Sequence, residues 1–114
     1  MTPAQARQLA LGLPGAVENP HHDLTSFRLP GVKGRIFATM TPDGAELRAF
    51  IKDDDARDAW IAREPGAVQP LYWGGKRCGV KVLLAHAKPA WVQPLLAQAW
   101  RDNGGPRADV ATLG

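Results

Sequence analysis

Residues 35–51, RIFATMTPDGAELRAFI, hold the clearest fold signal in this chain of 114 residues. Two runs rich in strand-forming side chains flank the segment Thr41-Pro42-Asp43-Gly44. Proline at the second of four positions, with Asp-Gly behind it, is typical of a β-turn. The stretch therefore predicts an antiparallel hairpin formed by residues 35–40 and 45–51.

Side-chain alternation along these two strands predicts two different faces of a sheet. One face is expected to be apolar and to pack in the core, with Ile36, Ala38, Met40, Leu47, Ala49 and Ile51. The other face is expected to carry Arg35, Phe37, Arg48 and Phe50, joined by Arg28 and Lys81 from other strands. Helices can cover only one face of such a sheet, so this second face is either an open binding surface or a charged surface that only contacts solvent.

Further strands and three helices are expected around the hairpin. The strands are predicted at residues 16–19, 26–29 and 79–84. The helices are predicted from Pro3 to about Leu11 with Thr2 as the cap, from Asp53-Asp54-Asp55 to Pro65-Gly66, and from Pro89 to a break at 103–106. Strand hairpins combined with helices indicate an α+β domain, in which a small antiparallel sheet carries helices on one face.

Length and composition indicate one globular domain. The chain is 45% hydrophobic and 22% charged, which is ordinary for a folded protein. We expect a single domain over residues 1–102 and a loosely ordered tail over residues 103–114. The chain has no long apolar run, no signal-peptide order at its start and a single cysteine. These features predict a cytoplasmic monomer without a membrane partner.

The positive charge of the chain is concentrated in one window. No acidic residue occurs between Glu64 and Asp102, whereas this window contains Lys76, Arg77, Lys81, Lys88 and Arg101. Within it, Tyr72-Trp73 precede Gly74-Gly75-Lys76-Arg77. The N–H groups of a Gly-Gly turn together with two cations can hold a phosphate, although a solvated turn explains the same residues. Trp73 either stacks on a base or anchors the loop to the core.

An ordered series of short motifs runs through the chain: LPGAVE at 13–18 followed by Pro20-His21, SFR at 26–28, KGRIFA at 33–38, WGGKR at 73–77 and GVKV at 79–82. In this order and spacing, from about Leu9 to Asp102, the chain resembles the MmcQ/YjbR family. The resemblance implies a CyaY-like α+β fold with strand-and-loop projections described as a double wing. It also implies a DNA-binding role with no established enzymatic reaction. Tips of such wings are expected at residues 31–35 and 74–77.

Other residue groups fit catalysis or metal binding poorly. His21, His22 and Asp23 are adjacent, and neighbours on a strand point to opposite sides. Cys78 has basic neighbours in the sequence that would lower the pKa of its thiol, but no Cys-His-Asn pattern accompanies it. The spacing GVKG at 31–34 matches a KH-domain loop, yet predicted strands rather than helices flank it. We therefore expect no enzymatic activity, no cofactor and no metal site.

The sequence favours a nucleic-acid-binding module that contacts DNA phosphates. The expected contacts come from the loop tips and the sheet: Lys33, Arg35, Lys76, Arg77, Arg28, Arg48, Lys81 and Trp73. Two alternatives remain open. The same sheet face would bind an acidic protein partner, or a pocket between the sheet and the helices near Trp73 would bind a small molecule.

Overall fold

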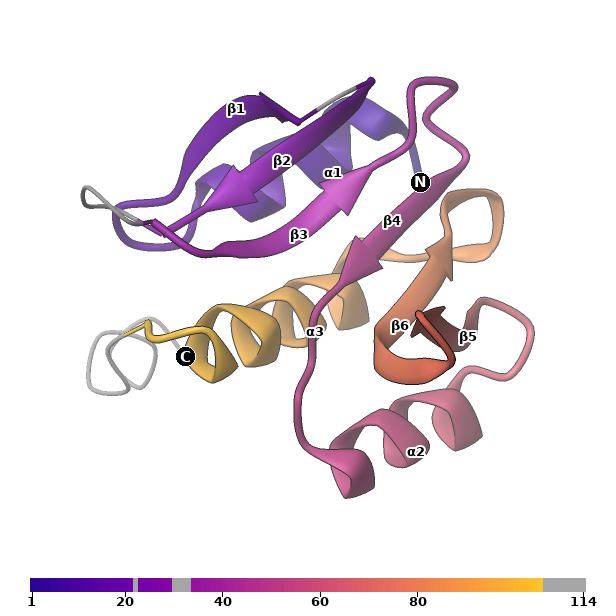
Figure 1. The fold of residues 1–114 in the computed structure, drawn as a ribbon. Helices are drawn as coiled ribbons and strands as arrows, with labels where there is room; N and C mark the ends of the chain where they lie inside the picture. The colour runs from indigo at the N-terminus through magenta and orange to yellow at the C-terminus, as the bar shows by residue number, and fades with distance from the viewer. Residues whose placement is uncertain (22, 30–33, 106–114) are drawn as a thin grey trace.

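A computed structural model describes residues 1–21, 23–29 and 34–105 of the chain. Its elements follow the predicted order of helix, strands, helix, strands, helix (Figure 1). They are α1 (Pro3–Leu11), β1 (Val17–His21), β2 (Leu24–Arg28), β3 (Ile36–Met40), β4 (Glu46–Ala49), α2 (Asp54–Arg63), β5 (Val68–Trp73), β6 (Lys76–Leu83), a short 3-10 helix (Leu84–His86) and α3 (Pro89–Asp102). The predicted α+β class is confirmed.

The strands form one six-stranded antiparallel sheet in the order β1-β2-β3-β4-β6-β5. The predicted hairpin is present as β3 and β4, with Ala38 opposite Ala49 and Met40 opposite Leu47. Strand β5 was not predicted from the sequence, because Pro70 lies in its middle and proline is rare inside sheets. The strand order explains the exception, since β5 is an edge strand and pairs only with β6.

The three helices pack on one face of the sheet. Helix α3 contacts β3, β4 and α1, while α2 contacts β5 and β6. The ring centroids of Trp60 on α2 and Trp91 on α3 lie 6.4 Å apart, which joins the two helices. Buried aliphatic side chains from the sheet, such as Leu47 and Val82, complete this core. The other sheet face carries no helix within the described ranges.

The helix caps formed as predicted. The backbone N–H of Gln5 donates to Thr2 Oγ1 over 3.2 Å, and the Thr2 N–H donates to Gln5 Oε1 over 2.9 Å, so the two residues satisfy each other. At the start of α2, Asp53 Oδ2 accepts a hydrogen bond of 2.8 Å from the Ala56 N–H. The acidic run at 53–55 is therefore explained by helix capping.

A β-bulge between β2 and β3 changes the predicted sheet faces. Phe27 lies opposite Ala38, whereas Arg28 lies opposite Ile36, so Phe37 is an extra residue on β3. Because a bulge shifts the alternation of side chains, Phe37 is fully buried in the core and Ile36 moves to the helix-free face. The predictions for Ile36 and Phe37 were wrong for this reason.

The end of α3 is tied to the sheet. Asn103 is buried, and its side-chain amide donates to the Phe50 carbonyl over 3.0 Å and to the Ala99 carbonyl over 2.8 Å. The N–H of Gly105 donates to the Trp100 carbonyl over 2.8 Å. The first residues of the predicted tail thus pack against the domain, and residues 106–114 lie outside the described part.

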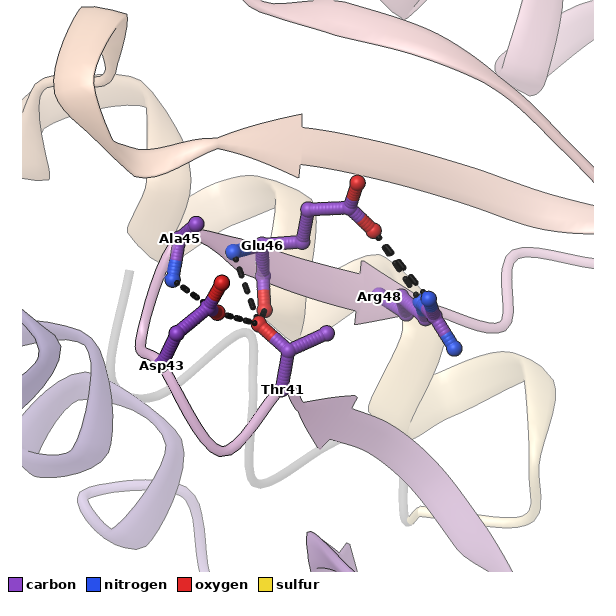
Figure 2. Close-up of polar contacts among 5 residues, drawn as sticks. All are labelled: Thr41, Asp43, Ala45, Glu46 and Arg48. Carbon is purple, nitrogen blue, oxygen red and sulfur yellow. Dashed lines mark hydrogen bonds and ion pairs between the residues drawn. The ribbon is translucent and has the colours of Figure 1, made fainter.

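The turn between β3 and β4 is held by a hydrogen-bond network centred on Thr41 and Asp43 (Figure 2). The carboxylate Oδ1 of Asp43 accepts from Thr41 Oγ1 over 2.7 Å and from the Ala45 N–H over 3.0 Å. Thr41 Oγ1 also accepts from the Glu46 N–H over 3.1 Å. The bond from Ala45, followed by the bond from Thr41, lowers the pKa of Asp43 below its ordinary value.

The lowered pKa of Asp43 predicts a pH-dependent contribution to stability. A carboxyl whose pKa is lower in the folded state stabilises the fold above its unfolded pKa, and this contribution is lost as the pH falls through the folded pKa. Asp43→Asn should therefore unfold at a lower urea concentration than the native protein at pH 7. The difference should shrink once the pH falls below about 4. If the difference in unfolding midpoint between the native protein and Asp43→Asn stays constant from pH 7 to pH 3, the negative charge of Asp43 does not stabilise the fold.

Candidate nucleic-acid interface

The β5–β6 hairpin ends in a two-residue turn that presents an aromatic ring and a cation together. Gly74 and Gly75 have φ values of 58° and 82°, and positive φ at both central positions is the signature of a type I′ turn. This turn places Trp73 directly opposite Lys76. Trp73 is 82% exposed, so the interpretation that it anchors the loop to the core was wrong. The tip predicted at residues 74–77 is the end of a hairpin, with Trp73 and Lys76 in cross-strand register.

Arg77 leaves the tip and faces helix α2. Its Nη2 donates to Asp58 Oδ1 over 2.7 Å, in an ion pair between residues 19 positions apart. This partner neutralises one of the two predicted tip cations. Lys76 is exposed and makes no ion pair with any residue in the described ranges. Lys76 is therefore the cation that the tip offers to an anion.

The helix-free sheet face brings several of the predicted cations together. Arg48 on β4 lies directly opposite Lys81 on β6, and both side chains are half-buried. Glu46 Oε2 accepts from Nε and Nη2 of Arg48 over 3.3 and 3.2 Å (Figure 2), which offsets part of this charge. Arg28 Nε donates to Ser26 Oγ over 3.1 Å on the same face.

The other predicted tip is described only in part. Arg35 is exposed, and its carbonyl accepts a 3.0 Å hydrogen bond from the Leu29 N–H at the entrance of this loop. Lys33 lies outside the described residues, as does most of the GVKG segment at 31–34. The structure therefore places Arg35 at the surface and does not describe its predicted partner cation.

A pocket opens in the helix-free sheet face beside the hairpin tip. Its volume is about 330 Å³, and its walls are Leu24, Ile36, Thr39, Arg48, Phe50, Leu71, Tyr72, Trp73 and Cys78. A pocket near Trp73 was expected between the sheet and the helices, but Thr39 and Arg48 are paired on the face away from them. Sequence reasoning missed Leu71 and Tyr72, because they belong to the unpredicted strand β5.

Cys78 borders this pocket as a half-buried, free thiol. Burial raises the pKa of Cys78, because desolvation disfavours the thiolate, while Arg57 and Arg48 offset only part of this effect. The prediction that the sequence neighbours Lys76 and Arg77 lower this pKa was wrong. The thiol is therefore neutral at pH 7 and is not an activated nucleophile.

Metal binding and membrane insertion find no support in the described part of the chain. It holds no group of three or more His, Cys, Asp or Glu side chains that could bind a metal ion, and His22 lies outside it. None of its helices is long and apolar enough to cross a membrane.

Comparison with known proteins places this small α+β protein in a family. The YjbR family model matches residues 11–102, and the chain belongs to this family. Among solved structures, the chain is similar to Deinococcus radiodurans protein DR2400, which is described with the domain name DUF419. The TM-score is 0.74 at 21% identity, over 99% of this chain and 88% of the other, and this likeness shows the shared fold. No curated protein sequence matches the chain.

Proposed function

We propose that the protein binds nucleic acid non-enzymatically, and that it prefers single strands, through the β5–β6 hairpin tip. The observation that carries this proposal is the pairing of Trp73, 82% exposed, with the exposed cation Lys76 across a type I′ turn. A large aromatic side chain exposed to this degree is a recurrent mark of a binding surface. An aromatic face beside a cation is the arrangement that stacks one unpaired base and neutralises its phosphate.

The sheet face extends this interface with further cations. Lys81 makes no ion pair with the described residues, and Arg35 and Arg28 likewise have no acidic partner there. The ion pairs of Arg77 with Asp58 and of Arg48 with Glu46 reduce the number of free cations below the sequence-based expectation. The resemblance to the family led us to expect one tip of a double wing at residues 74–77, where this hairpin ends.

Fluorescence anisotropy across a salt series tests this proposal. With about three phosphates neutralised on a single strand, the slope of log K against log salt should be roughly −2. Trp73→Ala removes the stacking surface and should weaken binding by about 1–3 kcal/mol. Lys76→Ala should bring the slope closer to zero by about 0.7, since one phosphate contact is lost.

Lys88→Ala provides the matched control for Lys76→Ala. Lys88 is an exposed lysine at the N-cap of α3, outside the β5–β6 hairpin, so its removal should leave the salt slope unchanged. A labelled duplex of the same sequence should bind more weakly than the single strand. Absence of binding at low salt, or equal effects of the two lysine variants, would overturn the proposal.

A further inference from the structure

The pocket on the helix-free sheet face has the size and walls of a small-ligand site. Its volume of about 330 Å³ falls within the range of about 300–1,000 Å³ that is typical of such sites. The walls include the apolar side chains of Ile36, Phe50 and Leu71. Tyr72 and Trp73, which are 57% and 82% exposed, stand at its border. Aliphatic walls with two aromatic rings favour a flat, apolar ring system as the occupant.

The polar groups of the pocket favour an anion on that ring system. The two bonds from Arg48 to Glu46 use its Nε and Nη2, and Nη1 has no partner within the described ranges. Lys81 lies directly opposite Arg48. Together, Glu46, Arg48 and Lys81 carry one net positive charge. A guanidinium group with a free N–H next to an apolar pocket can donate a strong, charge-assisted hydrogen bond to a carboxylate.

Besides Arg48, the hydroxyl of Thr39 is a polar group in the pocket wall. Thr39 is buried and lines the pocket, and its Oγ1 has no hydrogen-bond partner among the residues that the structure describes. A buried hydroxyl without a partner costs free energy, and most are paired in native structures. Rotation of the hydroxyl hydrogen about the Cβ–Oγ1 bond would let Thr39 donate to a ligand oxygen.

We propose that this pocket binds a small planar aromatic molecule that carries one carboxylate. The ring system lies between the aliphatic walls and the rings of Tyr72 and Trp73. The carboxylate accepts hydrogen bonds from Arg48 Nη1 and from the Thr39 hydroxyl. The pocket shares Trp73 with the hairpin tip but not Lys76, which does not line it.

Protection of Cys78 from alkylation tests this proposal directly. Cys78 is the single cysteine of the chain and lines the pocket, so its reaction with iodoacetamide reports occupancy. The probe is 2-naphthoate, and 2-naphthamide, which has the same shape without the charge, is its control. At ten times its dissociation constant, 2-naphthoate should slow alkylation by about tenfold, because only the free protein reacts. The amide should protect only at much higher concentrations.

Two substitutions at Arg48 separate charge recognition from simple apolar binding. Arg48→Met should weaken the affinity for 2-naphthoate by about tenfold to a hundredfold and leave the affinity for 2-naphthamide unchanged. Arg48→Lys should restore part of the loss. Arg63→Met is the matched control, because Arg63 lies on α2 over the Trp60 ring and not in the pocket. Circular dichroism and unfolding midpoints establish that each variant is folded.

The outcomes decide between the proposal and its alternatives. Equal protection by the acid and the amide, no protection by either, or an unchanged affinity in Arg48→Met would overturn it. Lys76→Ala should bind 2-naphthoate as the native protein does. A protein that does not bind nucleic acid can therefore still give a positive result in this test. If the pocket does not bind 2-naphthoate, the hairpin-tip proposal is unaffected.

Discussion

Replacing Gly79 with alanine should destabilise the protein by about 3 kcal/mol, because strands β4 and β6 leave no room for a Cβ atom. A Cβ at Gly79 would lie 2.1 Å from the carbonyl oxygen of Ala49 and 3.0 Å from its carbonyl carbon. Both atoms belong to the backbone of the neighbouring strand, so a side-chain rotation cannot relieve the overlap. Urea unfolding followed by circular dichroism should show a lower midpoint with an unchanged slope.

Gly66 offers a matched control for this substitution. A Cβ at Gly66 has no atom within 4 Å, so Gly66→Ala should change stability by no more than about 0.5 kcal/mol. If Gly79→Ala unfolds at the same urea concentration as Gly66→Ala, the close approach of the two strands is not a constraint on the sequence.

Replacing Trp100 with alanine should cost about 3–5 kcal/mol, which is the range for removing a large aromatic side chain from a core. Trp100 on α3 is fully buried, and its indole N–H donates to the Pro14 carbonyl over 3.2 Å. This bond joins the last helix to the segment after α1, so the variant loses both packing and a long-range contact. Trp100→Phe should be milder, since the ring volume is largely kept.

Trp73→Ala is the same substitution at an exposed tryptophan and is the control for Trp100→Ala. Because Trp73 is 82% exposed, its removal should change stability by at most about 0.5 kcal/mol. The two variants thus compare a buried tryptophan of the core with an exposed tryptophan at the hairpin tip. Equal unfolding midpoints for both would contradict this assignment.

Local signals in the sequence were sufficient for the helices and for the central hairpin. Thr2 and Asp53 accept hydrogen bonds from backbone N–H groups within the first turn, so their effect depends on neighbours in the sequence. The turn at 41–44 likewise depends on neighbours in the sequence, since the Gly44 N–H donates to the Thr41 carbonyl. Strand β5 escaped prediction, because Pro70 argues against a strand unless the strand is known to lie at an edge.

The candidate site was less predictable, because it depends on contacts between distant segments. The ion pair of Arg77 with Asp58 connects a hairpin to a helix and neutralises a cation that we expected at the tip from the sequence. The bulge at Phe37 depends on the pairing of β2 with β3, and it moves Ile36 into the pocket wall. The exposure of Trp73 follows from the turn, since the hairpin end extends beyond the core.

Both outer strands of the sheet contain a proline, Pro20 in β1 and Pro70 in β5. Each pairs with one inner strand only, so the position that would carry the proline N–H falls on the outward side. The row of donors that another chain would need for edge-to-edge pairing is therefore interrupted at both ends of the sheet. This interruption opposes fibril growth and intermolecular sheet extension, which are hazards for any open sheet.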